Sequence, residues 1–272
     1  MLKKTNIGYS LLKGLVCLIC ISPLYVMFYL SLSSSTYYFA QEWFPKEMLW
    51  ENFTTAWTKA AFNKAFLNST VITLGAVAVL VLISASAGYA AARFQTKVNR
   101  FFFNLMLMSM LVPGIINTVP LYTLMRKINA INTYWGIILL LACSSLPFSV
   151  FLYESFISSM SAELEEAAML DGCTRFQSFW TIVFPQLKPI TATVVIMQGI
   201  GIWNNYSQTV FFLQDKNYHT VPLAISRFFN TYGADYNLMA ASAVIGLLPV
   251  IIIFIILQKE FVSGLSAGAV KG

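Results

Sequence analysis

Long apolar stretches separated by short polar segments run through the whole chain. Six of them are long enough to cross a membrane, for which a helix needs about 20 residues. They lie at Leu12–Leu32, Thr70–Arg93, Phe101–Met125, Tyr134–Ile157, Ile190–Leu213 and Leu238–Gln258. The chain is therefore predicted to be all-α, a polytopic membrane protein with six transmembrane helices.

The third apolar stretch contains two prolines close together. Pro113 and Pro120 bracket Gly114, Asn117 and Thr118. Each proline removes a helical hydrogen bond and tends to kink its helix. Transmembrane helices tolerate this where neighbours or water satisfy the freed carbonyl. The third span is expected to be bent or locally unwound; curvature needed only for packing is the alternative.

A polar segment between the fourth and fifth stretches, residues 158–189, has the signals of two short helices and a hinge. We refer to it as the elbow. Ser161 is expected to cap the first helix, with Glu163 and Glu165 in its first turn, where negative charge suits the helix dipole. Gly172 is expected to end that helix in a left-handed conformation.

The second helix of the elbow is predicted to start at Thr174, a capping residue. Four apolar residues then follow at helical spacing on one face, and two prolines are expected to break the helix before the next apolar stretch. These residues are Phe176, Phe179, Trp180 and Val183, followed by Pro185 and Pro189. A rigid amphipathic elbow at the membrane surface is suited to receive force from a soluble partner.

Composition supports a membrane location. Hydrophobic residues make up 58% of the chain and charged residues 10%, whereas soluble domains have about 25% charged residues. The net charge of +6 does not point to nucleic acid, because no basic stripe interleaves with aromatics. The positive-inside rule explains the excess more simply.

The distribution of Lys and Arg predicts the orientation. With a cytoplasmic N-terminus, ten of these residues fall inside and seven outside, as the rule expects. The elbow and both termini are then cytoplasmic. Lys3, Lys4 and Lys13 also suit a signal peptide, but the first stretch is long and lacks an Ala-x-Ala cleavage site, so an uncleaved span is favoured.

Two longer loops then lie outside, Ser33–Ser69 and Gln214–Asn237, and both carry aromatic residues. Such residues are typical of interfacial belts or of amphipathic helices lying on the membrane. A docking surface for a soluble partner is the alternative.

No catalytic or metal-binding constellation is visible. His219 is the single histidine, and the four cysteines lack further ligands nearby. The sequence has no phosphate-binding G-x-x-x-x-G-K-[ST] loop, so energy must come from another chain or an ion gradient. Glu154, the only acid well inside an apolar stretch, is interpreted as an interfacial anchor.

Uncharged polar residues inside the apolar stretches are the candidates for substrate contact. Amides in hydrocarbon are costly unless hydrogen-bonded, so they are expected to face other helices or a wet cavity. An amide and aromatic wall suits sugars, and interhelical hydrogen bonding is the alternative. The candidates are Asn117, Thr118, Gln198, Trp203, Asn204, Asn205 and Gln208.

Several motifs resemble those of one transporter family. Glu166-Ala167-Ala168, Asp171-Gly172, Ile182 and Pro185 resemble the EAA loop of membrane-spanning subunits of bacterial ATP-binding-cassette (ABC) importers. The ending Glu260–Gly272 is similar to that of the maltose-permease-like, carbohydrate-importing branch. Gly88–Phe94 and Trp203–Asn205 resemble the family more weakly. Cys173 and Phe184 depart from the usual Ala and Leu.

The resemblance implies one permease domain over residues 1–272, with a coupling loop at 158–189 and a cytoplasmic tail at 259–272. Its implied partners are a second permease, two ATPase subunits that hold the ATP and Mg²⁺, an extracytoplasmic solute-binding protein, a carbohydrate and the bilayer of the bacterial cytoplasmic membrane. This chain itself would bind no cofactor, metal or nucleic acid and catalyse no reaction. The implied ATPase-coupling residues are Glu166, Ala167, Ala168, Asp171, Gly172, Phe176, Phe179, Pro185, Gly268 and Lys271.

Three alternatives stay open from the sequence. An ion-coupled carrier would need an inverted repeat and buried ionisable residues, and a membrane enzyme would need catalytic acids, His or Ser pairs in its spans. A related permease for polyols, glycerol phosphates or acidic oligosaccharides is the third.

Overall fold

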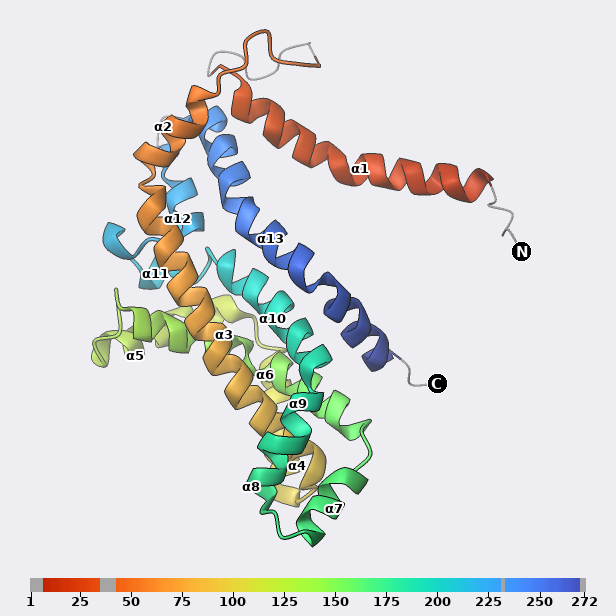
Figure 1. Ribbon diagram of the computed structural model, residues 1–272. Coiled ribbons are helices and arrows are strands. Elements are labelled where there is room, and N and C mark those ends of the chain that lie inside the picture. The colour runs from red at the N-terminus through yellow and green to blue at the C-terminus, as the bar shows by residue number, and fades with distance from the viewer. Residues whose placement is uncertain (1–6, 35–42, 231–232, 270–272) are drawn as a thin grey trace. The chain divides into compact units, whose positions relative to one another are not determined.

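The computed structural model describes residues 7–34, 43–230 and 233–269. Helices make up most of this part of the chain (Figure 1). A small antiparallel hairpin pairs β1 (Phe229–Asn230) with β2 (Gly233–Ala234), with Phe229 opposite Ala234. The predicted all-α class is confirmed.

Among the helical segments, η1 and η3 are 3₁₀-helices and η2 is a π-helix. In chain order, these segments are α1 (Ile7–Leu32), α2 (Glu51–Lys59), α3 (Phe62–Arg93), α4 (Lys97–Ser109), η1 (Gly114–Asn117), α5 (Thr118–Lys127), α6 (Tyr134–Ser158), α7 (Glu163–Leu170), α8 (Arg175–Ser178), η2 (Phe179–Val183), α9 (Phe184–Gln186), α10 (Lys188–Trp203), α11 (Thr209–Phe212), η3 (Lys216–Tyr218), α12 (Val221–Ser226) and α13 (Tyr236–Ala269).

Four helices in the described part of the chain are long and apolar enough to cross a membrane, or up to six candidates if each of two bent pairs is one span. The four are α1, α3, α6 and the part of α13 up to Ile256. The first bent pair combines α4 with η1 and α5, and the second combines α8–α9 with α10, at angles of 99° and 73°. Each predicted span therefore has a helical counterpart.

The third predicted span is broken at the first of its two prolines. Helix α4 ends at Ser109 and the chain resumes as η1 at Gly114, after Pro113. A proline disfavours helical geometry in the residue before it, which accounts for the gap. Pro120 lies in the first turn of α5, where backbone N–H groups have no helical partner in any case. The expected bend is confirmed.

The fifth span ends earlier than the sequence suggests. The apolar stretch runs to Leu213, but α10 ends at Trp203 and a separate short helix, α11, follows. Asn205 explains the interruption, because its Oδ1 accepts hydrogen bonds from the backbone N–H groups of Gln208 (3.1 Å) and Thr209 (3.4 Å). Such a side-chain bond competes with helix continuation and favours a new helix start.

Contacts group the chain into two compact units. The first comprises Met1–Asn63 and Leu223–Pro249. Within it, the buried Asn52 of α2 donates from Nδ2 to the carbonyls of Ser31 (2.9 Å) and Ser33 (3.0 Å) at the end of α1. Asn237 Nδ2 donates to Asn52 Oδ1 (3.3 Å). The aromatic loop after α1 thus includes a helix, α2.

The second unit comprises Lys64–Pro222 and Val250–Gly272. Its helices α3, α6 and α10 pack closely. A Cβ placed on Gly88 of α3 would lie 2.6 Å from Tyr153 Cβ and 3.0 Å from the Glu154 backbone nitrogen, so only glycine allows this approach. The buried Tyr153 hydroxyl donates to Thr191 Oγ1 of α10 (2.9 Å). The helices α7, α8 and α9 gather at the Arg93 end of α3 (Figure 1).

Candidate functional site

The first helix of the elbow, α7, begins at Glu163. The expectation that Ser161 caps this helix is wrong by one position, because Ala162 is the N-cap and makes no side-chain bond. Ser161 lies just before it, and its Oγ accepts the Glu163 N–H (3.2 Å). Glu163, Glu165 and Glu166 all lie in the first turn. Negative charge there is favoured by the helix dipole, so the helix start is locally encoded.

Gly172 ends α7 in the way that the sequence predicts. Its φ is +92°, a conformation that other L-residues rarely adopt. The Cys173 N–H donates to the Ala168 carbonyl (3.0 Å) and the Gly172 N–H to the Met169 carbonyl (3.2 Å). These two bonds form a Schellman motif, which sets the direction in which the chain leaves the helix.

Thr174 caps the second helix, again as predicted. Its Oγ1 accepts the Gln177 N–H (3.3 Å), while Gln177 Oε1 accepts the Thr174 N–H (2.9 Å). This reciprocal arrangement is a capping box. The Schellman motif ends at Cys173 and the capping box begins at Thr174, so the two motifs are directly adjacent and define the turn between the two helices on both sides.

The second helix departs from the prediction after Ser178. It continues as the π-helix η2 and then as α9, which contains Pro185. Pro185 therefore does not break the helix; the break falls at Leu187, and Pro189 lies in the first turn of α10. A proline ring in an α-helix would clash with the carbonyl four residues earlier. The π turn directly before Pro185 relieves that clash by changing the hydrogen-bond register.

The four apolar residues of the expected face differ in burial. The sequence pattern puts Phe176, Phe179, Trp180 and Val183 together. In the structure Phe179 and Val183 are buried, Trp180 is half-buried and Phe176 is 74% exposed. Trp180 contacts Phe176, as their spacing of four residues predicts, and also Phe184, with ring centroids 6.2 and 4.9 Å apart. Phe176 is therefore the exposed end of this face, and Phe179 and Val183 are its buried part.

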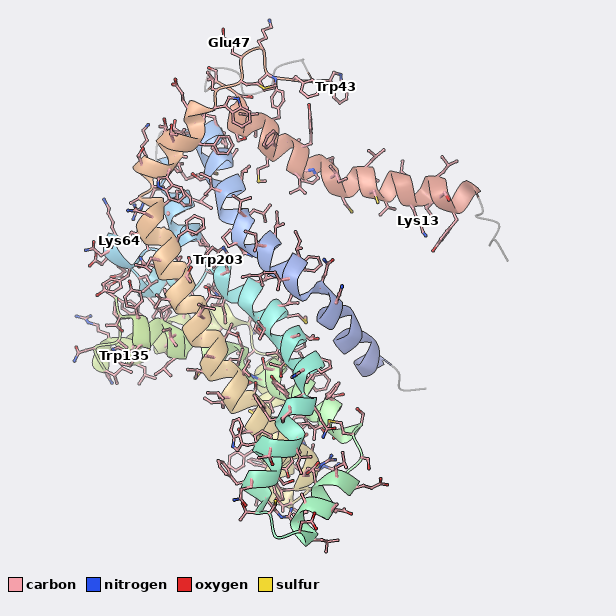
Figure 2. All side chains as sticks on the ribbon, viewed as in Figure 1. Lys13, Trp43, Glu47, Lys64, Trp135 and Trp203 are labelled. Carbon is pink, nitrogen blue, oxygen red and sulfur yellow. The ribbon has the colours of Figure 1, made fainter. Side chains whose placement is uncertain are left out.

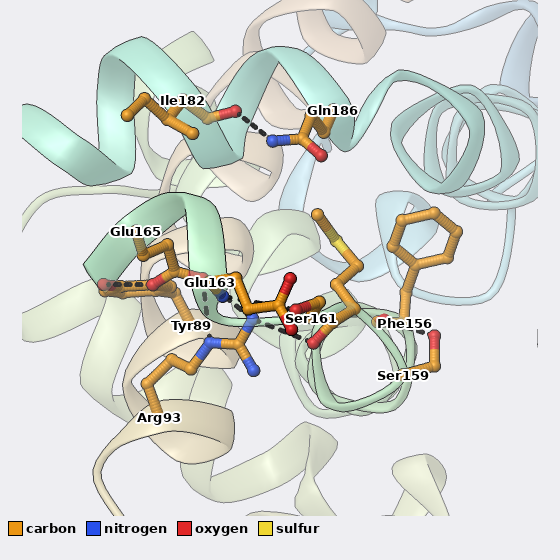
Figure 3. A network of polar contacts seen from close by, with 10 residues as sticks. Tyr89, Arg93, Phe156, Ser159, Ser161, Glu163, Glu165, Ile182 and Gln186 are labelled. Carbon is orange, nitrogen blue, oxygen red and sulfur yellow. Dashed lines mark hydrogen bonds and ion pairs between the residues drawn. The ribbon is translucent and has the colours of Figure 1, made fainter. Parts of the chain in front are cut away.

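A buried polar network that the sequence does not predict fixes α7 to α3 (Figure 3). Glu165 Oε1 accepts from Arg93 Nε (2.9 Å) and Nη2 (2.8 Å), and its Oε2 accepts from the Tyr89 hydroxyl (3.0 Å). Arg93 Nη2 also donates to the Met160 carbonyl (3.2 Å). The spacing of Tyr89 and Arg93, one helical turn apart, is the available signal, but it does not identify Glu165 as their partner.

The predicted coupling residues divide by exposure. Ala168 and Phe179 are buried. The exposed ones are Glu166, Ala167, Asp171, Gly172, Phe176 and Pro185. Gly268 lies within α13, and Lys271 lies outside the described residues. Residues 259–272 are expected from the resemblance to form a cytoplasmic tail, and the structure continues α13 through this segment as far as Ala269. Pro249 is the last proline of the chain, so no residue beyond it removes a backbone donor from this helix.

The predicted cavity residues differ in their exposure and in the contacts that they make. Asn117 and Asn204 are exposed, and Thr118, Gln198, Asn205 and Gln208 are half-buried. Trp203 (Figure 2) is only 6% exposed. Its ring meets the Phe66 ring of α3 edge-on, with the ring centroids 5.8 Å apart. Gln208 Nε2 donates to Ser144 Oγ of α6 (3.1 Å), an interhelical bond of the kind weighed as the alternative. Asn205 and Gln208 are also bonded to each other (3.3 Å).

In the portions of the chain that the structure describes, no three His, Cys, Asp or Glu side chains are grouped so as to hold a metal ion. What the arrangement offers is mechanical. A helical membrane core has a two-helix loop whose turn is defined by its own capping bonds and whose first helix is anchored to the core by a buried ion pair.

These features define a class, polytopic helical membrane proteins with a structured two-helix loop between two spans. Residues 81–266 match the family described as the inner membrane component of binding-protein-dependent transport systems. The chain belongs to this family, and the expected resemblance to permease subunits of ABC importers is confirmed. It is accordingly a transport subunit of the membrane and not an enzyme.

Two relatives are similar over almost their full length. The melibiose/raffinose/stachyose import permease protein MelC of Bacillus subtilis (strain 168) is 38% identical over 264 residues, covering 97% of this chain and 96% of MelC. The probable starch degradation products transport system permease protein AmyC of Thermoanaerobacterium thermosulfurigenes is 29% identical, covering 99% of this chain and all of AmyC.

A solved structure has the same fold. A chain of a bacterial ABC transporter involved in the import of the acidic polysaccharide alginate superposes with a TM-score of 0.82 at 22% identity, covering 94% of this chain and 96% of that one. A chain of a bacterial alginate ABC transporter in complex with an alginate pentasaccharide-bound periplasmic protein superposes with a TM-score of 0.63 at 16% identity.

Proposed function

We propose that this chain is the permease subunit through which an ATP-driven importer moves a sugar or oligosaccharide across the membrane. Family membership supports the transport role. The named cargoes of relatives support the substrate class: melibiose, raffinose and stachyose for MelC, starch degradation products for AmyC, and arabinooligosaccharides for AraQ of Bacillus subtilis (strain 168), which is 34% identical over 84% of this chain.

The proposed assembly pairs this chain with a second, related permease and with two ATPase subunits. ATP and Mg²⁺ would be held by the ATPases. An extracytoplasmic solute-binding protein would deliver the carbohydrate, in keeping with the family's dependence on binding proteins. In the proposed orientation both termini and the elbow are cytoplasmic, as the excess of Lys and Arg on that side suggests. Residues 1–272 would act as one permease domain.

The observation that carries this proposal is the geometry of the elbow. Its turn is defined by a Schellman motif and a capping box, and the side chains beside that turn point outward. Leu170 and Phe176 are 89% and 74% exposed. We infer that these two side chains, next to the defined turn, belong to a contact surface, where buried apolar anchors contribute much of the binding energy.

Acidic and small residues around the turn between the two elbow helices complete the proposed contact with an ATPase. Glu166 and Asp171 would supply charge, and Ala167 would allow close approach. The buried residues Ala168 and Phe179 would hold the elbow against its own core instead of touching the partner. Pro185 is exposed and would lie at the edge of the contact. Gly268 and Lys271 are proposed to reach the ATPase interface from the end of α13.

The substrate path is proposed to involve the uncharged polar residues of the third and fifth spans. Asn117 and Asn204 are exposed in this chain and are the first candidates for contact with sugar hydroxyls. Thr118 and Gln198 are half-buried and would line the same path. Trp203, Asn205 and Gln208 make the internal contacts described above, so they would shape the path from behind.

Reconstitution tests the proposal. Proteoliposomes containing this chain, its partner permease and the ATPases, with ATP in the cytoplasmic-side compartment, would be given a radiolabelled sugar with and without the binding protein. The panel would include raffinose, a maltodextrin, an acidic oligosaccharide, glycerol phosphate and a polyol. We expect uptake of a neutral oligosaccharide that needs both ATP and the binding protein and persists when ionophores dissipate ion gradients.

Two results would contradict the proposal. Uptake that needs no ATP and stops with ionophores would make the chain an ion-coupled carrier. Uptake restricted to glycerol phosphate, a polyol or an acidic oligosaccharide would keep the importer but replace the substrate class.

A further inference from the structure

The ion pair between Arg93 and Glu165 joins two segments more than seventy residues apart in sequence. Both side chains are largely removed from solvent, with 15% and 8% of their surfaces exposed. Burying two charges is costly unless their geometry and hydrogen bonds are good. Here Arg93 donates to Glu165 from two nitrogens, and the second carboxylate oxygen accepts from Tyr89. The carboxylate is therefore held from two directions by α3.

The positions of the two charges on their helices are also favourable. Arg93 is the last residue of α3, and Glu165 lies in the first turn of α7. A cation near a helix C-terminus and an anion near an N-terminus are each stabilised by the helix dipole. The pair thus links the end of one helix to the beginning of the other (Figure 3).

Glu165 and Glu166 are neighbours in sequence but differ in exposure. Glu165 is buried against Tyr89 and Arg93, whereas Glu166 is exposed. Successive residues of an α-helix point about 100° apart, so α7 offers one carboxylate inward and one outward. A partner that moves the outer side of α7 would move Glu165 with it.

Aromatic contacts attach the second helix of the elbow to the same end of α3. The Tyr89 ring lies 4.8 Å from the Phe179 ring, which in turn contacts Trp180 at 4.9 Å. The Arg175 guanidinium lies 5.1 Å from the centre of the Phe94 ring. Both helices of the elbow therefore contact the segment from Tyr89 to Phe94.

The next contact along α3 leads into the helical core. Gly88 precedes Tyr89 and lies directly against the backbone of α6 at Tyr153 and Glu154. Close-packed interiors transmit displacement because they have little free volume. A shift of the Arg93 end of α3 would therefore act on α6 as well.

We propose that Glu165, Arg93 and Tyr89 are positioning residues that transmit movement of the elbow to α3 and so couple ATP-driven motion to the spans. This rests on the proposed function, since it assumes a partner that displaces α7. The three residues would contact neither sugar nor ATP. Their role would be to make α7 and the end of α3 move as one body.

The first test compares conservative variants in the assembled transporter. Glu165→Gln, Arg93→Gln and Tyr89→Phe would be made singly, together with the double variant Arg93→Gln/Glu165→Gln, which leaves no unpaired buried charge. Glu163→Gln is the matched control, because Glu163 is an exposed glutamate in the same first turn of α7. The amount of assembled complex, ATP hydrolysis stimulated by loaded binding protein, and sugar transported per ATP would be measured.

We expect the double variant to assemble like the control but to lose at least about fivefold in stimulated hydrolysis per complex, the lower end of typical coupling effects. Sugar transported per ATP should also fall. Tyr89→Phe removes one hydrogen bond and keeps the ion pair, so its loss should be smaller. If the double variant keeps normal stimulation and normal transport per ATP, the proposal is overturned. A loss of assembled complex with unchanged activity per complex would also overturn it, since that outcome indicates a role in folding alone.

The second test needs neither ATP nor sugar. In a background without native cysteines, spin labels would be attached at Leu82 of α3 and Leu164 of α7, which are 51% and 61% exposed. We expect a narrow distribution of label distances that broadens in the double variant but not with Glu163→Gln. Broadening supports the linkage even if no carbohydrate is transported. An unchanged width refutes the linkage even if transport is normal, so failure of the linkage and failure of the proposed function are separable.

Discussion

Replacing Gly172 separates backbone conformation from side-chain contact in the elbow. A Cβ added at this position meets no atom within 4 Å, so a larger residue encounters no steric obstacle outside its own backbone. The φ of +92° remains the obstacle. L-residues pay about 1–2 kcal/mol to adopt left-handed geometry, and a β-branched residue such as valine is a stronger outlier there.

The variant chain has two ways to respond. It can keep the turn and accept the strain, or it can relax and give up the two Schellman bonds, made by the N–H groups of Gly172 and Cys173. Each such bond contributes about 0.5–1.5 kcal/mol net. Both routes cost about 2 kcal/mol, which reduces the population of the native turn by a factor of roughly 30.

The series Gly172→Asn, Gly172→Ala and Gly172→Val tests this reasoning. Asparagine tolerates left-handed geometry better than alanine does, so stimulated ATP hydrolysis in the assembled transporter should fall in the order Gly, Asn, Ala, Val. The amount of each variant in the membrane serves as the control. Normal transport with Gly172→Val would refute the elbow as the force-receiving part, and equal damage by Asn and Val would show that backbone conformation is not the cause.

Three further predictions follow from the topology, the packing and the proposed path. Single cysteines at Ser161 and Lys216, in a background without native cysteines, should be labelled from opposite sides of the membrane; labelling of both from outside would overturn the orientation. Gly88→Ala should destabilise the purified protein by about 1–3 kcal/mol through overpacking and so lower its melting temperature. Gly201→Ala, where an added Cβ meets nothing within 4 Å, should leave the melting temperature unchanged or raise it. Asn204→Leu should alter sugar uptake but not co-purification with the ATPases, and normal uptake of every sugar would assign this amide to helix packing.

Features encoded by neighbouring residues were predictable from the sequence. The turn at Gly172 and the cap at Thr174 depend on bonds that reach three to five residues, and local patterns specify such bonds. The spans were predictable because each apolar stretch is long enough by itself to cross the hydrocarbon core of a membrane. The break at Pro113 follows from proline geometry alone.

Features that depend on competition or on distant partners were not predictable. The end of α10 at Trp203 depends on the backbone N–H groups that Asn205 binds, whereas the polar residues at this point are equally suited to interhelical bonds or substrate contact. The π turn before Pro185 replaces the expected break. The ion pair of Glu165 requires knowing that α7 folds back onto the end of α3. The sequence offers two adjacent glutamates and no means of assigning one inward and the other outward.

The end of α13 provides the last prediction. The span Tyr236–Ile256 is complete without the final residues, so deleting Ser263–Gly272 should leave membrane insertion intact. The helix nevertheless continues to Ala269, although residues after the span are no longer apolar enough to be held by lipid. A segment of this kind gains from contact with another protein, and an ATPase is the partner proposed above. We expect the deletion to lower sugar-stimulated ATP hydrolysis of the assembled complex at an equal amount of inserted permease. Equal stimulation with and without the segment would remove the end of α13, including Gly268, from the proposed interface.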